Sequence, residues 1–289
     1  MVEVLKQIFL GLVQGFSEFL PISSSGHLKL FQSLFGFEST ENSFISIMLH
    51  LGTLVAVFIV YHALIGSMIV EFFKLVKDLF TGRFRWSAMN ETRRMVVMVF
   101  ISTAVLLIML IPFGSHNLME YLEMLNEIES LIPLGIAFMV TGVLLIVTFI
   151  VNAKYQHRRT EPSVKDALVI GGAQCVATIA GISRSGSTMA SGLLCGLSRE
   201  YMVAYSFIMS IPPILAAAAT EAKAVMESTT PLTVEVAPMV AGMISAAVFG
   251  VLSIKAIQWL IKKDRYKLFG YYCLTLGVLV IILSLAKVI

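Results

Sequence analysis

The sequence predicts an all-α polytopic membrane protein made of two repeats of inverted topology, each a re-entrant helix hairpin followed by three transmembrane helices. Three observations lead to this class. Hydrophobic residues make up 57% of the 289 positions and charged residues only 13%, about half the charged fraction of a soluble domain. Apolar stretches long enough to cross a bilayer recur along the chain. Two polar segments, one in each half, align with each other.

The two polar segments run from Gln14 to His27 and from Gln174 to Thr188. Identical residues match in an ungapped alignment: Gly11 with Gly171, Gln14 with Gln174, Ser23 with Ser183, Ser25 with Ser185, and Gly26 with Gly186. The apolar arms around them are too short to cross a bilayer, which takes about 20 residues. Non-helical backbone at membrane depth must be buried in protein or line a wet cavity. Each segment therefore predicts the turn of a re-entrant hairpin.

The remaining elements follow the same plan in both halves. The first repeat covers residues 1–153, with a hairpin over 2–37 and spans over about 44–62, 95–113 and 131–152. The second covers 154–289, with a hairpin over 166–197 and spans over about 203–220, 237–260 and 268–288. Three crossings in each half turn the second half upside down relative to the first. That arrangement is typical of transporters whose site lies at the repeat interface.

Positive charge supports this topology. Of the 21 Lys and Arg residues, 14 fall in the polar stretches 63–94, 153–165 and 261–267, which the prediction places on one side. The opposite stretches, 114–130 and 221–236, together hold only Lys223. Because Lys and Arg favour cytoplasmic loops, both termini should face outward. The first hairpin then enters from outside, the second enters from the cytoplasm, and their tips meet within the membrane.

Charge and cysteine content exclude other classes. The net charge is +3 without a basic run, so nucleic acid is not an expected partner. The spacing of Cys175, Cys195 and Cys273 matches no metal site, and we interpret these residues as small core hydrophobes.

Ionisable side chains fall at the predicted hairpin tips. These are Glu18, His27 and Arg184. An arginine at the centre of a membrane helix costs about 2.5–3.5 kcal/mol on an insertion scale, so such residues are usually paired and functional. The alternative is that Glu18 and Arg184 form only a structural ion pair. The accompanying histidine and hydroxyls favour a functional site, because packing alone does not need them.

Together the tips would present the groups that phosphate chemistry uses. Helix N-termini beside Gly26 and Gly186 can bind phosphate, arginine can bind it with two hydrogen bonds, and a hydroxyl beside a histidine is a minimal activated nucleophile. A carboxylate can hold a divalent cation against phosphate oxygens. The hydroxyls are those of Ser23, Ser24, Ser25, Ser183, Ser185, Ser187 and Thr188. The residues predict phosphate ester or anhydride chemistry in a membrane, or binding of an anionic lipid without chemistry.

These segments resemble the BacA/UppP type undecaprenyl-diphosphate phosphatases of bacterial cell-wall synthesis. One signature, Glu/Gln-Gly-x-x-Glu-x-x-Pro-x-Ser-Ser-x-Gly-His, is met by Gln14 to His27. The other, Pro-Gly-x-Ser-Arg-Ser-Gly-x-Thr, is met by Gly181 to Thr188, with Ala180 in place of the proline. A weaker match runs from Leu49 to Leu54 on the first span. The hydropathy plan fits along nearly the whole chain.

The resemblance implies a multi-pass enzyme of the plasma (inner) membrane that removes the terminal phosphate of undecaprenyl diphosphate. The product is the monophosphate carrier lipid of peptidoglycan synthesis, and the family is associated with bacitracin resistance. The resemblance also implies a divalent cation, Mg²⁺ or Ca²⁺, and a site that opens to the outer face. The expected partners are the polyprenyl diphosphate lipid, the bilayer and, in a homodimer, a second copy of the chain.

The resemblance also implies roles for individual residues. Glu18 would be a metal ligand or base, Ser24 the nucleophile, His27 the general acid/base and Arg184 the phosphate clamp. The phosphate pocket would comprise Ser23, Ser25, Gly26, Ser183, Ser185, Gly186 and Thr188. Gln14, which stands where many members have a second glutamate, would be a neutral metal ligand or a hydrogen-bond donor.

Several alternatives stay open at this stage. Water could attack directly, with His27 or Glu18 as base, in place of a covalent step on Ser24. His50 is either a core residue of the first span or a neighbour of the site. A polyprenyl-phosphate flippase would share the inverted repeats but release no phosphate. A second membrane phosphatase superfamily shares the Ser-Gly-His and Ser-Arg elements, but its other motifs are missing here.

Overall fold

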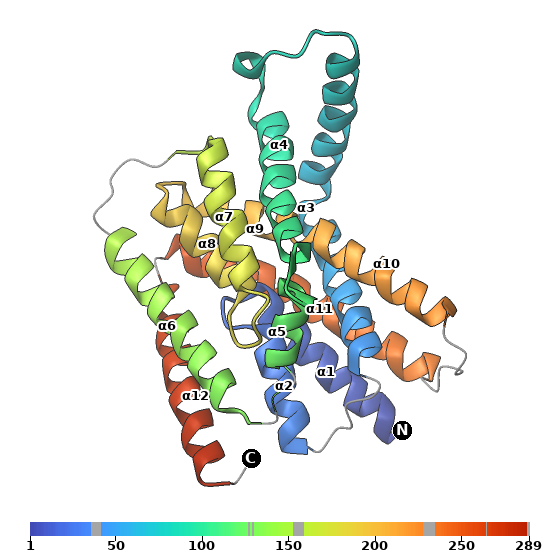
Figure 1. The fold of residues 1–289 in the computed structure, drawn as a ribbon, viewed down its shortest axis with the longest axis vertical. Coiled ribbons are helices and arrows are strands. Elements are labelled where there is room, and N and C mark those ends of the chain that lie inside the picture. Colours follow the sequence, from blue (N-terminus) through green and yellow to red (C-terminus); the bar gives the residue numbers. More distant parts are fainter. Residues whose placement is uncertain are drawn as a thin grey trace.

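The computed structural model describes residues 1–35, 42–126, 128, 130–152, 159–227, 235–263 and 265–287. These residues form helices and one two-stranded hairpin (Figure 1). The helices are α1 Val2–Phe19, α2 Ser24–Phe35, α3 Asn42–Phe80, α4 Glu91–Ala104, α5 Leu118–Asn126, α6 Ile132–Asn152, α7 Val164–Val176, α8 Arg184–Leu194, α9 Arg199–Met209, α10 Ile211–Glu227, α11 Val236–Lys262 and α12 Lys267–Leu285. Strands β1 Pro112–Phe113 and β2 His116–Asn117 pair antiparallel, and 3-10 turns cover Trp86–Ala88 and Val105–Leu110.

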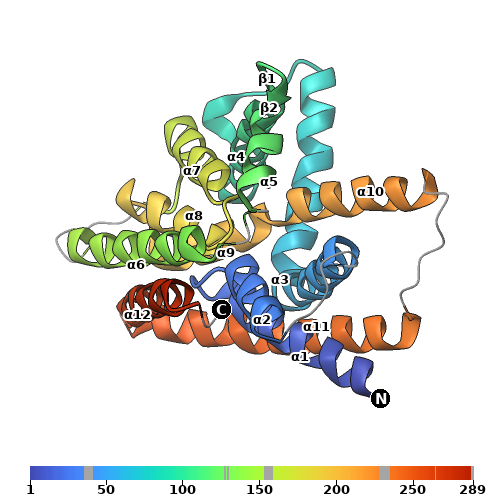
Figure 2. The same ribbon diagram turned by 60° about the horizontal axis from the view of Figure 1, so that its bottom comes forward.

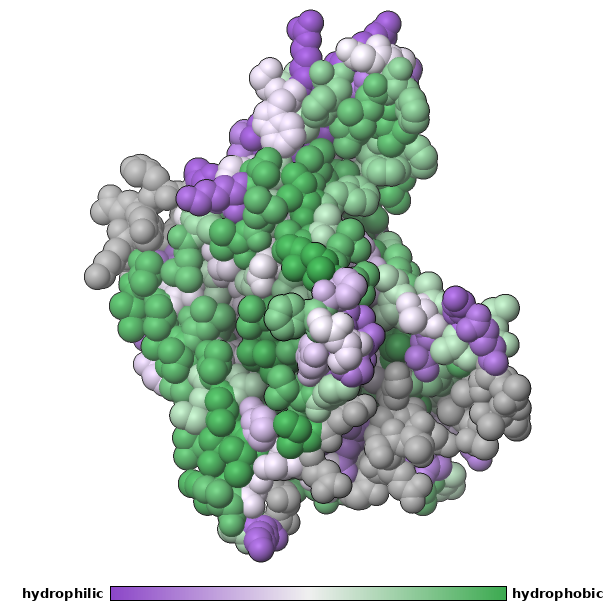
Figure 3. Space-filling view, in the orientation of Figure 1, coloured by the Kyte–Doolittle hydropathy of each residue, from purple (hydrophilic) through white to green (hydrophobic). Residues whose placement is uncertain are grey.

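Six stretches of the described chain are helical, long and apolar enough to cross a membrane: Phe44–Phe80, Glu91–Leu110, Ile132–Asn152, Arg199–Glu227, Val236–Lys262 and Lys267–Leu285. Hydrophobic side chains cover most of the visible surface, while hydrophilic ones gather at the free end of α3 and α4 (Figure 3). An all-α, multi-pass membrane protein is therefore confirmed. Both termini lie at the end opposite the α3–α4 connection (Figure 1).

The division into two repeats stays a prediction. The boundary at residues 153–154, the end of the first hairpin at residue 37 and the end of the last span at residue 288 lie outside the described residues. The hairpin regions themselves are each two helices joined by a turn, α1–α2 and α7–α8.

Helix α3 is much longer than the span expected over 44–62. It bends at Tyr61, where φ is −106° and ψ is 21°, and then continues to Phe80, a little past Lys77, the end of the helical extension that the sequence allows within the polar stretch 63–94. The carboxylates of this extension are paired. The guanidinium of Arg93 on α4 donates to Glu71 at 2.9 Å and to Asp78 at 2.7 Å. These ion pairs join the ends of α3 and α4, so the charges do not require a loop.

The expected span over 203–220 consists of two helices, α9 and α10, which meet at Ser210. Pro212 and Pro213 lie in the first turn of α10. Proline has no backbone N–H to donate, and the first turn is the part of a helix that tolerates this loss. The chain therefore ends one helix and starts another within the span.

The expected loop 114–130 contains a folded element that supports the second hairpin. Asn126, at the end of α5, donates from Nδ2 to the carbonyl of Thr178 at 3.3 Å. Its Oδ1 accepts from the backbone N–H of Ala180 at 2.9 Å. Since residues 178–180 belong to the α7–α8 turn, α5 positions that turn.

Small residues bring α1 against α11. A Cβ on Gly11 would lie 2.2 Å from the carbonyl oxygen of Gly242, so a larger side chain would force the helices apart. The hydroxyl of Ser245 donates to the carbonyl of Ile8 at 2.8 Å across the same contact. Close approach through small residues and interhelical hydrogen bonds is how membrane helices associate. This packing holds the first hairpin arm in place.

Helices α6 and α12 also pack closely through small residues, in another part of the molecule. A Cβ on Gly277 would lie 2.5 Å from the carbonyl oxygen of Gly135, and one on Gly142 would lie 2.7 Å from that of Gly270. Figures 1 and 2 show the pair lying along one side of the hairpins. The turns of the two hairpins meet near the centre of the molecule, between these helix pairs.

Candidate functional site

The turn of the first hairpin is set by a proline and a serine cap. Pro21 removes a backbone donor and restricts the residue before it to extended backbone, and Leu20 is extended with ψ at 142°. Ser23 has φ at 70°, an uncommon value for a residue with a side chain. Its Oγ accepts from the N–H of Gly26 at 3.3 Å and so caps α2. Strained backbone of this kind is frequent at functional sites.

The turn of the second hairpin is built in a related way. The Oγ of Ser183 accepts from the N–H of Gly186 at 3.1 Å and caps α8. Gly181 has φ at 95°, and a Cβ there would lie 2.7 Å from the Cβ of Ala137 on α6. Thr141 on α6 donates to the carbonyl of Gly181 at 3.1 Å and accepts from the N–H of Ser183, also at 3.1 Å. Helix α6 therefore fixes where α8 begins.

The two turns meet through an ion pair. Arg184, the first residue of α8, donates from Nη2 to Oε1 of Glu18 near the end of α1. The hydroxyl of Ser185 also donates to the carbonyl of Leu20 at 3.2 Å. The carboxylate is almost fully buried, with 3% of its side chain exposed. A buried charge is tolerated when it is paired and hydrogen-bonded, and Arg184 provides the opposite charge.

The other carboxylate oxygen gathers the first hairpin's own polar groups. Ser24 Oγ donates to Oε2 of Glu18 at 2.6 Å, and Gln14 Nε2 donates to the same oxygen at 2.9 Å. The short Ser24 distance is typical of a hydroxyl bonded to a carboxylate. Glu18 therefore lies between a hydroxyl that it can deprotonate and a cation that can bind an anion.

A cavity of about 200 Å³ opens at this junction. Its wall combines both hairpin turns with one residue of α3: Ser17, Glu18, Ser23, Ser24, Ser25, His50, Ala177, Thr178, Ile182, Ser183, Arg184 and Ser185. Helices α2 and α8 both begin at this wall, and the first N–H groups of a helix have no partner inside it. Their positive dipole ends and the arginine make the cavity a place for a phosphate group.

His50 belongs to this cavity. Its Nε2 lies 3.5 Å from Oε2 of Glu18. Its Nδ1 lies 2.7 Å from the carbonyl of Ser46, and since a carbonyl only accepts, Nδ1 carries the hydrogen in this contact. The ring is thus held with Nε2 toward the carboxylate. The sequence alone favours a core role for His50, and its one pointer to the site is the weak motif Leu49 to Leu54.

His27 lies elsewhere. Its Nδ1 donates to the carbonyl of Ser23 at 2.7 Å, and its Nε2 lies 2.7 Å from the hydroxyl of Tyr272 on α12. The ring also stacks on that of Tyr272, with 5.7 Å between centroids. Both ring nitrogens are therefore directed away from Ser24. In this arrangement His27 holds the hairpin turn against α12.

The remaining predicted residues divide into two groups. Ser23, Ser25, Ser183 and Ser185 line the cavity with Glu18, Ser24 and Arg184. Gly26, Gly186 and Thr188 lie behind it. The two glycines donate to the capping serines, and Thr188 Oγ1 lies 2.6 Å from the hydroxyl of Ser206. The wall is completed by His50 and by residues that sequence reasoning did not assign: Ser17, Ala177, Thr178 and Ile182.

The donor set for a divalent cation is small. Among the residues that the structure describes, no three His, Cys, Asp or Glu side chains lie together as a metal site. Glu18 is the one carboxylate of the described cavity wall, and it is already bonded to Arg184, Ser24 and Gln14. The buried Oε1 of Gln14 has no hydrogen-bond partner within the described part of the chain. These groups fit a cation such as Mg²⁺, which is often bound by one carboxylate together with substrate phosphates.

Comparison with known proteins gives consistent matches along the chain. The sequence model of a family described as "Bacitracin resistance protein BacA" matches residues 7–279. A protein named undecaprenyl-diphosphatase from Methanosphaera stadtmanae is 38% identical, over 98% of this chain and 99% of the relative. Proteins of the same name from Alkaliphilus metalliredigens and Halothermothrix orenii are 36% and 35% identical, the first over 97% of this chain and 98% of the relative, the second over 98% of each.

Proposed function

The chain belongs to the BacA family, and from this membership and the geometry of the cavity we propose that it hydrolyses undecaprenyl diphosphate to undecaprenyl phosphate and inorganic phosphate. The reaction regenerates a carrier lipid used in cell-wall synthesis. One observation carries the proposal. At the junction of the two turns, a single buried carboxylate contacts both a serine hydroxyl and an arginine. A nucleophile, a base and an anion-binding group are thus assembled within one small cavity.

Phosphate is bound by Arg184 and by the N-termini of α2 and α8. Only Nη2 of Arg184 is bonded to Glu18, and a guanidinium has five N–H donors. The other donors can therefore hold phosphate oxygens while the ion pair persists. Positive groups fixed before the reaction stabilise the charge that develops on the transferred phosphoryl group, which is the main source of catalysis in phosphoryl transfer.

In the first step, the Oγ of Ser24 attacks the terminal phosphorus. Its proton passes to Glu18, to which it is already bonded at 2.6 Å. The bond from Oγ to phosphorus forms as the bond to the bridging oxygen breaks, and undecaprenyl phosphate leaves with the electron pair. Water then attacks the phosphoserine, phosphate leaves, and Glu18 returns the proton to Ser24. In the alternative route Glu18 takes the proton directly from water. His27 has no part in either route because its ring faces α12.

A divalent cation completes the proposal. Glu18 and Gln14 are the residues that would hold Mg²⁺ or Ca²⁺, which would supply positive charge to neutralise the substrate phosphates. The family resemblance implies a location in the inner membrane with the cavity open to the outer face, and the charge pattern of the loops agrees with this orientation because it places the entry of the first hairpin outside. A homodimer is a further part of the proposal. No feature of the described structure favours lipid transport over hydrolysis.

A matched pair of serine variants tests the function and its route. Ser24→Ala removes the hydroxyl bonded to Glu18, whereas Ser25→Ala removes a neighbouring hydroxyl of the same wall. We expect purified wild-type protein to release phosphate from undecaprenyl diphosphate in the presence of Mg²⁺ or Ca²⁺. Ser24→Ala should lose on the order of a thousandfold in kcat or more, as nucleophile variants do, and Ser25→Ala should keep most of the activity.

Each outcome has a distinct meaning. Near-normal turnover by Ser24→Ala would exclude the covalent route and leave attack by water with Glu18 as base. Binding of the lipid by wild-type protein without phosphate release, under any cation, would contradict the proposed function and favour a lipid-binding protein.

A further inference from the structure

The catalytic cavity is too small and too polar to hold a polyprenyl chain. Its volume is about 200 Å³, and serines, Glu18, His50 and Arg184 form most of its wall. Transfer of an apolar chain out of polar surroundings is favourable, by about 25 cal/mol for each Å² that becomes buried against apolar atoms. A prenyl diphosphate bound there, as the proposed function requires, must therefore direct its chain out through an apolar opening.

A second cavity of about 230 Å³ adjoins the first between α3 and α10. His50 and Arg184 line both cavities, so the two share a wall. Beyond these two residues its lining is mostly apolar: Ser46 and Ile47 on α3, and Pro213, Ile214 and Ala217 on α10. A phosphate held by Arg184 therefore lies at the border between a polar cavity and an apolar one.

The first turn of α10, just after the break from α9, forms one wall of this cavity. Pro212 and Pro213 occupy the first turn of α10, which starts directly after Ser210. Along this turn the helix presents different residues to the two sides. Ile214 is 8% exposed and faces the α3–α10 cavity, whereas Leu215 is 48% exposed and lies outside it.

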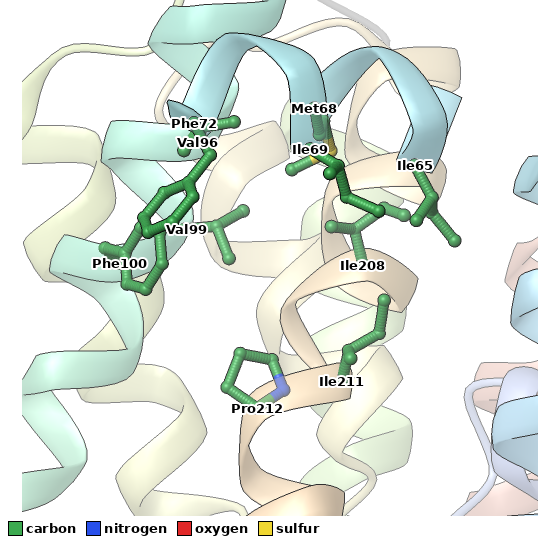
Figure 4. A pocket seen from close by; sticks show the side chains of 10 residues that line it. All are labelled: Ile65, Met68, Ile69, Phe72, Val96, Val99, Phe100, Ile208, Ile211 and Pro212. Atoms are coloured by element: carbon green, nitrogen blue, oxygen red, sulfur yellow. The ribbon is translucent and has the colours of Figure 1, made fainter. Parts of the chain in front are cut away.

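A separate apolar groove lies on the other side of the same turn. It has a volume of about 230 Å³ and lies between α3, α4 and the α9–α10 junction. Figure 4 shows Phe72, Val99 and Phe100 on one side of it and Ile208, Ile211 and Pro212 on the other. Pro212 lines this groove and Pro213 lines the α3–α10 cavity. Because the two prolines are consecutive, the groove and the cavity flank one turn of α10.

We propose that the α3–α10 cavity is the portal through which the prenyl chain of the substrate leaves the catalytic cavity, and that the apolar groove holds the chain farther along. The inference rests on the proposed function and adds a binding path for the lipid tail. The isoprene units next to the diphosphate contact Ile47, Pro213 and Ile214. Units farther from it pass over the first turn of α10 and pack on Ile69 and Phe100.

The portal is tested with one variant and a control on the next residue. Ile214→Trp fills the portal, and Leu215→Trp adds the same side chain to the outward face of the same helix. Phosphate release is measured from undecaprenyl, farnesyl and methyl diphosphate. We expect Ile214→Trp to lower kcat/KM about tenfold for both prenyl substrates, as changes in the shape of an apolar pocket do, and to leave methyl diphosphate unaffected. Leu215→Trp should match the wild type on all three.

The groove is tested with a second pair on α3. Ile69 lines the groove and is 52% exposed, whereas Val70 is 53% exposed and lies outside it. Ile69→Trp should lower kcat/KM for undecaprenyl diphosphate a few-fold and leave farnesyl diphosphate unchanged, because its three isoprene units end before the groove. Val70→Trp should change neither. Equal values for Ile69→Trp and Val70→Trp on the long substrate would remove the groove from the path.

A binding readout keeps the inference separate from catalysis. A farnesyl diphosphate analogue with a benzophenone at its far end is photocrosslinked to the full-length wild-type protein, and the modified peptides are identified by mass spectrometry. Crosslinks on residues 46–50 of α3 or 211–217 of α10 support the portal, even if no variant or wild-type protein releases phosphate. Crosslinks confined to α6 or α12, or a uniform loss of all three activities in Ile214→Trp, would overturn it.

Discussion

The turns of the two hairpins share nearly the same helix-capping pattern, but their side chains differ in chemical character. In each, a serine caps a helix by accepting from the N–H of a glycine three residues later, Ser23 with Gly26 and Ser183 with Gly186. In each, the capped helix begins at the wall of the cavity. The two similar turns bring two helix N-termini to one place, and this arrangement favours binding of an anion.

Aligned positions in the two turns carry different side chains. Glu18 matches Thr178, and Ser24 matches Arg184. The first turn thus carries the acid and the hydroxyl, and the second carries the cation. Thr178 Oγ1 donates to the carbonyl of Cys175 at 2.7 Å, so it only satisfies its own helix end. Neither turn is a site alone, since the buried charge of one is neutralised by the other.

The largest effect is expected from removing the cation of the second turn. Arg184→Ala should lower phosphate release by roughly 10³–10⁵-fold, the range for an arginine that stabilises a transferring phosphoryl group. It also leaves Glu18 buried and unpaired, which costs about 3–5 kcal/mol of stability. Arg184→Lys keeps the positive charge but loses the planar guanidinium that can bind phosphate with two hydrogen bonds. Compared with Arg184→Ala, it should therefore restore stability more than activity.

A double variant separates the two effects of Arg184. Glu18→Gln in the Arg184→Ala background removes the unpaired charge, so its thermal midpoint should return toward that of the wild type while activity stays lost. If Arg184→Ala alone keeps activity within about tenfold of the wild type, a change of 1.4 kcal/mol or less, the ion pair is structural and the comparison of the two turns fails.

An effect of intermediate size on activity should distinguish His50 from His27. His50→Ala removes the ring beside Glu18 and should lower kcat about 10²-fold, the lower end for groups that assist proton transfer, with little change in thermal stability. His27→Gln should lower stability and activity together, because it loosens the turn from α12. Tyr272→Phe, which removes only the partner of His27 Nε2, should show the same pattern more weakly.

The outcome for His27 distinguishes support of the turn from proton transfer. If His27→Gln abolishes activity at unchanged stability while Tyr272→Phe resembles the wild type, His27 transfers a proton in a conformation other than this one. The sequence-based role of His27 would then be restored.

The smallest effect is expected at the two aligned glutamines, Gln14 and Gln174. Gln14 bonds to Glu18 at 2.9 Å, whereas the buried amide of Gln174 has no hydrogen-bond partner among the described residues. An unsatisfied buried amide costs about 1–3 kcal/mol. Gln174→Leu should therefore keep activity and leave the thermal midpoint unchanged or higher. Gln14→Leu should lower activity several-fold, and a loss of activity in Gln174→Leu would contradict the assignment.

Local pattern was enough to predict much of this site. The proline and the serine–glycine caps mark both turns, and Glu18, Ser24 and Arg184 meet as the paired polar segments indicated. It was not enough where a helix boundary depends on distant partners. The sequence allowed a helical extension of the first span only through Lys77, but α3 continues to Phe80, where Arg93 on another helix pairs with Glu71 and Asp78.

The sequence by itself determined the class of protein, the two turns and the polar side chains placed in them, because apolar stretches, proline and helix caps are recognised from neighbouring positions. Only the tertiary structure decided which histidine reaches the carboxylate. Ser24 and His27 are one turn apart on α2 and share a face by spacing alone. Packing against α12 directs His27 to Tyr272, and the position of α3 brings His50 to Glu18. The rotation and placement of whole helices depend on contacts distant in sequence, which no local pattern records.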